Sequence, residues 1–200
     1  SLSEVSGDTL SPIYSLLGTQ TSESNFVHER NNLIVEDTIA FYYLKTLFSI
    51  FKPKQKVFFL PSTNLESVPL LVNLMTGWKL KFGLLLCDNP EARQVAKKIR
   101  ESLYFSDDES FQKDIRIMDG FDCCENLFST IDFKKFILKK RIGITESNSD
   151  YIRNNGLVRI DLARAFTLHN QNQSLKPSDF DEETRENVKT LMEQIAVVLK

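Results

Sequence analysis

The segment Asn32-Leu-Ile-Val-Glu-Asp-Thr-Ile-Ala-Phe-Tyr-Tyr-Leu44 contains the pattern that decides the fold prediction. Residues 33–35 form a short apolar run that ends at Glu36 and Asp37, and apolar residues then recur at helical spacing as far as Phe48. This pattern predicts a buried strand followed by a helix. We expect the helix to end before Pro53, because proline lacks the N–H that a helix interior requires. A strand that leads directly into a helix is typical of α/β folds.

The same alternation continues toward the C-terminus. Apolar runs predict three further strands, over residues 56–60, 82–87 and 115–118, and the segments between them predict helices over 65–76 and 90–103. Helical connections of this length favour parallel pairing, because each crossover returns the chain to the same end of the sheet. The sequence therefore predicts an α/β fold with a Rossmann-like parallel sheet of about four strands, flanked by helices.

Composition divides the chain into three segments. Residues 1–31 are rich in Ser, Thr, Asn and Glu, and we interpret them as a lead-in segment with a helical turn near the apolar stretch 13–17. Residues 32–122 form the predicted α/β core. Residues 123–200 are expected to be a helical C-terminal extension packed on this core, with a helix over 130–141, a loop over 143–156 and an amphipathic helix that begins near Ser178 or Asp181.

The overall composition excludes several classes of protein. The chain has 200 residues, of which 42% are hydrophobic and 26% charged, and its net charge is −2, which argues against disorder. No apolar run approaches the roughly 18 residues that a membrane-spanning helix needs, so no membrane span is predicted. With no apolar leader and only three cysteines, nothing indicates a disulfide framework, and the cytoplasm is the expected location.

One edge of the predicted sheet gathers polar side chains. Right-handed crossovers place the C-terminal ends of all four strands at this edge, where Glu36, the 62–64 loop, the Asp88-Asn89 pair and Asp119 are expected to converge. Such oxygen ligands suit a divalent cation held against a phosphate. Alternatively, Glu36 and Asp37 cap the N-terminus of one helix and Asp88 caps the next, since a negative charge there contributes about 0.3–1 kcal/mol. Spacing alone leaves both interpretations open.

The order of the motifs resembles the TOPRIM domain, the metal-dependent module of topoisomerases, bacterial primases and OLD-family (overcoming lysogenization defect) nucleases. Residues 32–44 look like the first strand of that family with its glutamate, and residues 81–99 look like its Asp-x-Asp strand and the helix that follows. The flanking segments 9–18 and 122–128, and the segment 161–166 with the final helix, are similar to OLD-family nucleases. The resemblance covers nearly the whole chain.

This resemblance implies a set of site residues. Glu36 matches the glutamate that acts as general base or metal ligand, and Asp88 is the second residue expected to be catalytic. Glu125 matches a later acidic ligand, so that Glu36, Asp88, Asn89 and Glu125 are the ligands implied for Mg²⁺.

The chain also departs from the pattern of the family. Asp37 stands where the family has glycine, Ala40 where it has an aspartate, and Asn126 where it has the acidic neighbour of the later ligand. An ungapped alignment places Cys87 and Asn89 at the two metal-binding aspartates. Because two-metal phosphodiester cleavage needs several carboxylates, the resemblance implies weakened or lost Mg²⁺-dependent cleavage.

The family also implies partners. The chain would be the TOPRIM-like domain of an OLD-family ATPase-nuclease that acts on DNA in phage defence or repair, with a homodimer among the expected states. ATP would bind only to a separate ATPase domain preceding residue 1, because the chain has no Gly-rich phosphate loop. One alternative is a non-catalytic dimerisation or DNA-binding module of the same fold. Another is an unrelated doubly wound domain that binds a small anion at the helix after Asn64.

A basic cluster gives a second candidate site. Lys139, Lys140 and Arg141 follow Lys134 and Lys135, and on a helix these side chains would contact nucleic-acid phosphates. The simpler alternative is an ordinary amphipathic helix with a solvated basic face. Its buried face would comprise Phe133, Phe136, Ile137 and Leu138.

Overall fold

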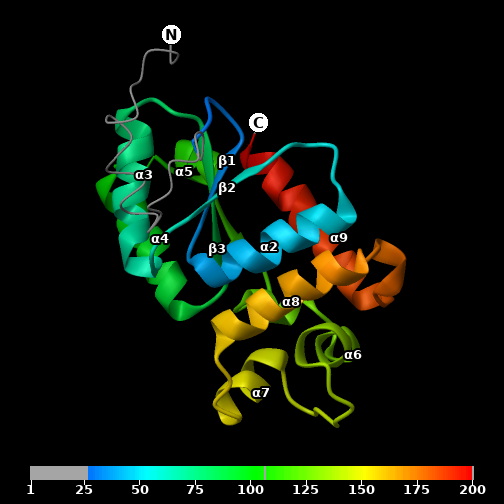
Figure 1. Cartoon of the computed structure of the whole chain (residues 1–200). Coiled ribbons are helices and arrows are strands. Elements are labelled where there is room, and N and C mark those ends of the chain that lie inside the picture. The colour runs from blue at the N-terminus through cyan, green and yellow to red at the C-terminus, as the bar shows by residue number, and fades with distance from the viewer. Residues whose placement is uncertain (1–26, 106, 200) are drawn as a thin grey trace.

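The computed structural model describes residues 27–105 and 107–199, and its centre is a sheet of four parallel strands (Figure 1). The strands lie in the order β2-β1-β3-β4. Val35 of β1 pairs with Pro61 on one side and with Leu85 on the other. The predicted α/β class and parallel sheet are thus confirmed. The strands are β1 (Asn32–Val35), β2 (Phe58–Pro61), β3 (Phe82–Cys87) and β4 (Ile115–Met118).

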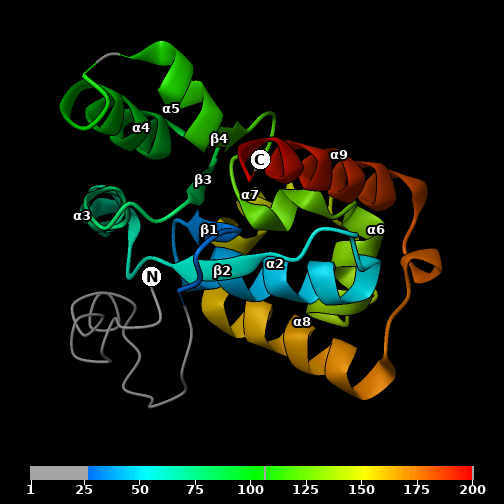
Figure 2. The ribbon, with the colours of Figure 1, turned by 90° about the horizontal axis from the view of Figure 1, so that it is seen from above.

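Helices cover both faces of the sheet (Figure 2). The chain moves from β1 to β2 in one direction and from β2 past β1 to β3 in the other. Because crossovers are right-handed, this reversal places α2 on one face and α3 and α4 on the opposite face. The helices are α2 (Thr38–Phe51), α3 (Val68–Gly77, preceded by the 3₁₀ turn Leu65–Ser67), α4 (Pro90–Ser102) and α5 (Asp108–Asp114).

The C-terminal extension packs on the face that α2 covers. Its longest helix, α9, has 17 residues and a charged outer face. Within the described ranges, no helix combines the length and apolarity needed to cross a bilayer. The elements are the 3₁₀ turn η3 (Cys124–Leu127), α6 (Thr130–Asp132), the π-helix η4 (Phe133–Leu138), α7 (Asn148–Asn154), α8 (Arg159–Gln173), the 3₁₀ turn η5 (Pro177–Asp179) and α9 (Glu182–Val198).

Two details of the extension differ from the prediction, and one prediction for the lead-in segment falls on residues that the structure does not describe. The helix predicted over 130–141 ends at Leu138, because Lys139 adopts a left-handed conformation (φ 54°) that closes the π-helix. The predicted loop over 143–156 contains α7, which Ser147 caps by accepting the N–H of Asp150. The helical turn expected near residues 13–17 lies outside the described residues.

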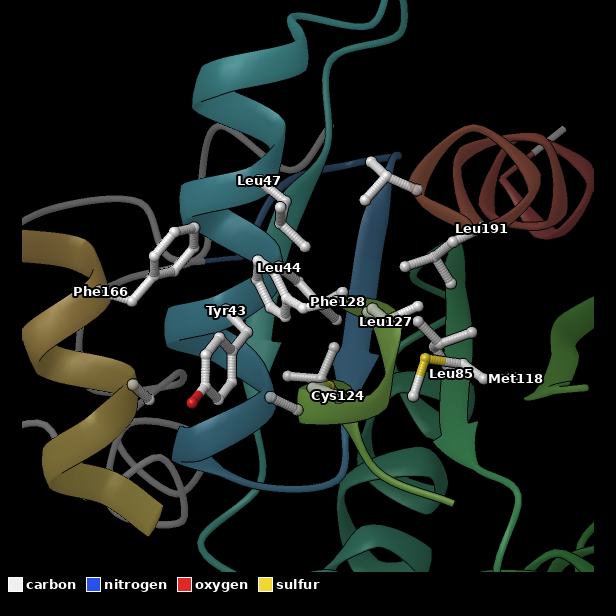
Figure 3. Close-up of a cluster of buried hydrophobic side chains, with 14 of the residues drawn as sticks. Tyr43, Leu44, Leu47, Leu85, Met118, Cys124, Leu127, Phe128, Phe166 and Leu191 are labelled. Carbon is white, nitrogen blue, oxygen red and sulfur yellow. The ribbon is translucent and has the colours of Figure 1, made fainter. Parts of the chain in front are cut away.

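One hydrophobic core joins the sheet to the extension (Figure 3). Tyr43, on α2, lies beside Phe128 and Phe166 with ring-centroid distances of 5.8 and 6.0 Å. Leu191 on α9 belongs to the same cluster as Leu85 on β3. Since each fully buried apolar side chain contributes about 1.5–3 kcal/mol, this shared core stabilises the sheet and the extension together.

Candidate functional site

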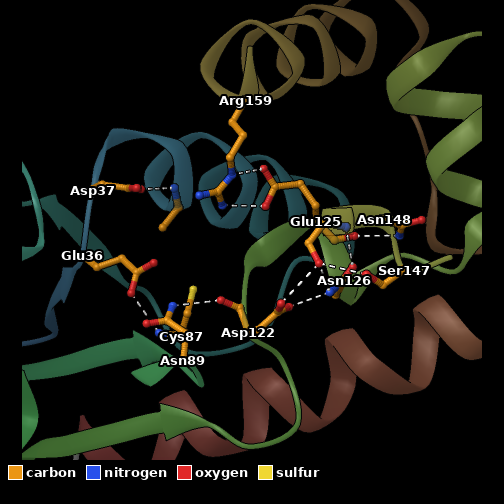
Figure 4. Close-up of polar contacts among 12 residues, drawn as sticks. Glu36, Asp37, Cys87, Asn89, Asp122, Glu125, Asn126, Ser147, Asn148 and Arg159 are labelled. Carbon is orange, nitrogen blue, oxygen red and sulfur yellow. Dashed lines mark hydrogen bonds and ion pairs between the residues drawn. The ribbon is translucent and has the colours of Figure 1, made fainter. Parts of the chain in front are cut away.

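The candidate site lies where the order of the strands reverses, between the C-terminal ends of β1 and β3. Open parallel sheets bind ligands at this position. Glu36 follows β1, and its Oε2 accepts a hydrogen bond of 3.0 Å from the backbone N–H of Cys87, the last residue of β3 (Figure 4). The two motifs singled out in the sequence therefore face each other across adjacent strands.

Glu36 is almost fully buried at this edge. Burial raises the pKa of its carboxyl group, and hydrogen bonds from the thiol and backbone of Cys87 offset part of that rise. A hydrogen bond with Cys124, together with burial, raises the pKa of the Cys87 thiol. Cys87 is therefore protonated at neutral pH, which is unsuitable for a nucleophile.

Two of the polar residues at this edge cap helices. Asp37 accepts the N–H of Ala40 at 2.7 Å and so caps α2. Asn89 accepts the N–H of Ala92 at 2.9 Å, which caps α4, and its Nδ2 donates to the carbonyl of Asp122 at 3.0 Å. The capping interpretation holds for Asp37. It is wrong for Glu36, which turns toward β3, and for Asp88, because Asn89 caps α4 instead.

Asp88, the residue after β3, contacts α4 and the loop that follows β4. Its Oδ1 forms an ion pair of 2.5 Å with Arg93 on α4, and its Oδ2 accepts the N–H of Gly120 at 3.2 Å. The backbone N–H of Asp88 also donates to the carbonyl of Phe121 at 2.7 Å. Asp88 therefore joins α4 to the loop that follows β4.

Glu125 is fully buried and is neutralised by an arginine. Nε and Nη2 of Arg159, the first residue of α8, donate to Oε1 and Oε2 of Glu125 at 2.8 and 2.7 Å. Burial opposes the charge of Arg159, but the hydrogen bonds and the charge of Glu125 outweigh it and raise the pKa of the guanidinium. Figure 4 shows the guanidinium reaching from α8 into the space between Asp37 and Glu125.

Asparagines hold the turn that carries Glu125. Nδ2 of the buried Asn148 donates to the carbonyls of Glu125 and Phe128 at 2.9 and 2.7 Å. The side chain of Asn126 donates to Asp122 and to Ser149 Oγ at 2.5 and 2.9 Å. These contacts hold η3 against the N-terminus of α7. The backbone position of Glu125 is therefore fixed by these contacts with α7 and does not depend on the ion pair with Arg159 alone.

Magnesium does not fit this set of donors as the side chains lie. Mg²⁺ requires near-octahedral oxygen ligands at about 2.0–2.1 Å. The four ligands implied by the resemblance have protein partners, namely Cys87 for Glu36, Arg93 and Gly120 for Asp88, Ala92 and Asp122 for Asn89, and Arg159 for Glu125. In the described part of the chain, no group of three or more His, Cys, Asp or Glu side chains is arranged to hold a metal ion.

No protein-family model, curated protein or solved structure matches this chain.

The other candidate residues lie elsewhere. Lys139, Lys140 and Arg141 are exposed and lie just after the π-helix, so the prediction that they extend from a helix is wrong. The interpretation of residues 133–138 as an amphipathic segment is confirmed, since Phe133, Phe136 and Ile137 are buried. At the anion site considered after Asn64, the Asn64 side chain caps the turn by accepting the N–H and the hydroxyl of Ser67, so this N–H is already paired.

Arg159 is the site residue that sequence reasoning missed. It lies 34 residues after Glu125, and no local motif links the two. One signal was present, because a cation in the first turn of a helix meets the positive end of the helix dipole and is disfavoured there. Such a residue needs a nearby acid, and Glu125 is that acid.

Proposed function

We propose that the chain is the TOPRIM-like domain of an OLD-family ATPase-nuclease in which Mg²⁺-dependent phosphodiester cleavage is lost. In this proposal, the guanidinium of Arg159 supplies the positive charge that a metal ion supplies in an active TOPRIM site. The observation that carries the proposal is the bidentate ion pair of Arg159 with the fully buried Glu125.

The charges at the strand ends support this assignment. Glu36, Asp37 and Glu125 all lie within electrostatic range of Arg159, which lowers the pKa of both Glu36 and Asp37 against the larger effect of burial. A buried group of acids needs a compensating cation. Since Arg159 already provides one, a divalent ion would have to displace it and would otherwise be repelled by it.

The contacts of Asp88 and Asn89, the other two implied metal ligands, also support the loss of metal binding. Asp88 is paired with Arg93, and Asn89 caps α4. To bind a metal ion, either residue would have to give up a contact that fixes the β3–α4 connection. The site thus favours the non-catalytic form of the domain, and we assign its contribution to DNA binding within a larger assembly that carries an upstream ATPase domain.

A plasmid-nicking assay tests the loss of cleavage. With supercoiled DNA and Mg²⁺ or Mn²⁺, the wild-type chain and the Glu36→Gln variant are expected to leave the plasmid equally intact. Nicking that EDTA abolishes, and that Glu36→Gln also abolishes, would overturn the proposal. Membership of the family has a separate test in the residues upstream of Ser1, where a Gly-x-x-x-x-Gly-Lys-Ser/Thr loop is expected.

A further inference from the structure

A basic hollow lies beside the π-helix of the extension, and it is defined here by residues Ile131, Lys134, Lys135, Lys139, Lys140, Arg141 and Ile142. Its volume is about 630 Å³. Five cationic side chains thus line one concave surface of a chain whose net charge is −2. Such a local concentration of one charge attracts anions of complementary shape.

The backbone explains why these side chains meet. The left-handed Lys139 reverses the chain, and the N–H groups of Lys139 and Lys140 both donate to the carbonyl of Lys134. This closure folds the 139–141 segment back beside the last turns of the π-helix. The backbone therefore brings the five basic residues to one side of the extension.

Most of these cations have no acidic partner. Over the described residues, no ion pair includes Lys134, Lys139, Lys140 or Arg141. Lys135 differs, because its Nζ donates to the carbonyl of Asp179 at 3.0 Å and lies 4.4 Å from the centre of the Phe136 ring. Lys139, Lys140 and Arg141 are thus exposed and free of ion pairs, Lys134 is half-buried, and Lys135 is held by its contacts with Asp179 and Phe136.

The lining indicates the kind of anion. We infer that the hollow binds the phosphodiester backbone of duplex DNA without reading its sequence. A cluster of cations without acidic partners suits the phosphates of a nucleic-acid backbone, which are bound through charge and counterion release. Single strands are usually bound by stacking on aromatic side chains, and among the described residues none that lines this hollow is aromatic.

An anionic membrane fits the hollow less well. Helices that bind at a membrane surface insert a broad apolar face. Here the apolar side chains of the π-helix, Phe133, Phe136 and Ile137, are buried in the core, and Ile131 is the one large hydrophobic residue of the hollow that is mostly exposed (62%). The inference deepens the proposed function and rests on it for the choice of DNA among polyanions, but it does not depend on whether cleavage is lost.

Fluorescence anisotropy with a labelled short duplex of arbitrary sequence, in low salt and EDTA, tests the inference. The triple variant Lys139→Gln/Lys140→Gln/Arg141→Gln is expected to bind at least tenfold more weakly than the wild type. It should also reduce the slope of log affinity against log salt by about 2–3, because about one counterion is released per phosphate contact. Circular dichroism checks that the variant is folded. Because EDTA removes divalent ions, the duplex stays intact during the measurement even if the chain retains Mg²⁺-dependent cleavage.

The matched control removes the same charge elsewhere. Lys54→Gln/Lys97→Gln/Lys98→Gln replaces three exposed lysines outside the hollow and is expected to bind within about twofold of the wild type. Equal weakening by both triple variants would overturn the inference, as would wild-type binding to phosphatidylserine vesicles but not to the duplex. A labelled single strand bound more tightly than the duplex would overturn the assignment to duplex DNA.

Discussion

Arg159 and Glu125 form a bidentate ion pair that joins the first turn of α8 to the buried turn η3. Glu125 is fully buried, whereas the side chain of Arg159 remains 39% exposed. Such a pair adds little stability by itself, because desolvation of both charges offsets their attraction. Removal of one partner is costly, since the other is left as an uncompensated buried charge.

We predict that Arg159→Met lowers the free energy of unfolding by about 3 kcal/mol, the lower end of the range for breaking a buried pair, because Arg159 is partly exposed. Urea denaturation measures the change. The control is Arg153→Met, which breaks an exposed pair with Asp150 and is expected to cost at most about 1 kcal/mol. Equal effects of the two substitutions would contradict the role given to Arg159.

Glu36 makes stability depend on pH in a defined direction. Burial raises its pKa above the ordinary value of 4.5, so the folded state holds the proton more tightly than the unfolded state does. This contribution to stability is present below pH 4.5 and is lost as the pH rises toward neutrality and through the raised pKa. Asp37, whose pKa burial also raises, adds a dependence of the same sign.

The neutral variant Glu36→Gln isolates this dependence, because its amide oxygen still accepts the N–H of Cys87. We predict that the difference in unfolding free energy, variant minus wild type, increases between pH 4.5 and 7. Urea denaturation at several pH values measures it. A difference that stays constant over this range would show that Glu36 titrates as it does in the unfolded chain.

Gly83 on β3 lies directly under the end of α9. A Cβ added at this position would approach Cγ2 of Val198 to 2.7 Å and Cδ2 of Leu199 to 3.2 Å. Gly83→Ala is therefore expected to lower the free energy of unfolding, measured by urea denaturation, by about 1–3 kcal/mol, because the added methyl group overpacks this contact. Adding Val198→Ala to the same chain should recover part of the loss. Gly143→Ala, where a Cβ meets no atom within 4 Å, is the control and is expected to be nearly neutral.

Much of the fold could be predicted because its determinants are local. The sequence predicts strands over 82–87 and 115–118, as observed, since both are apolar runs with clear ends. Parallel pairing then brought Glu36 to the end of β3 without any further information. Periodicity did not indicate where the helix beginning at Thr130 ends, because the end depends on the backbone conformation of Lys139.

The charge balance of the site could not be predicted in the same way. Whether a buried acid is satisfied by a metal ion or by an arginine depends on a contact between segments far apart in sequence, as between Glu125 and Arg159. The short helix α7 was missed for a different reason. Its seven residues show no apolar periodicity, and it is stabilised by the Ser147 cap and by the contacts of Asn148 with η3.

Binding of Mn²⁺, measured by electron paramagnetic resonance as the loss of the free-ion signal, tests the central claim most directly. With Arg159 in place of a metal ion, we predict that the wild-type chain binds no stoichiometric Mn²⁺ at millimolar concentration and that Glu36→Gln gives the same titration curve. One tightly bound Mn²⁺ per chain, lost on Glu36→Gln, would contradict the claim and would show that the acids at the ends of β1 and β3 form a metal site.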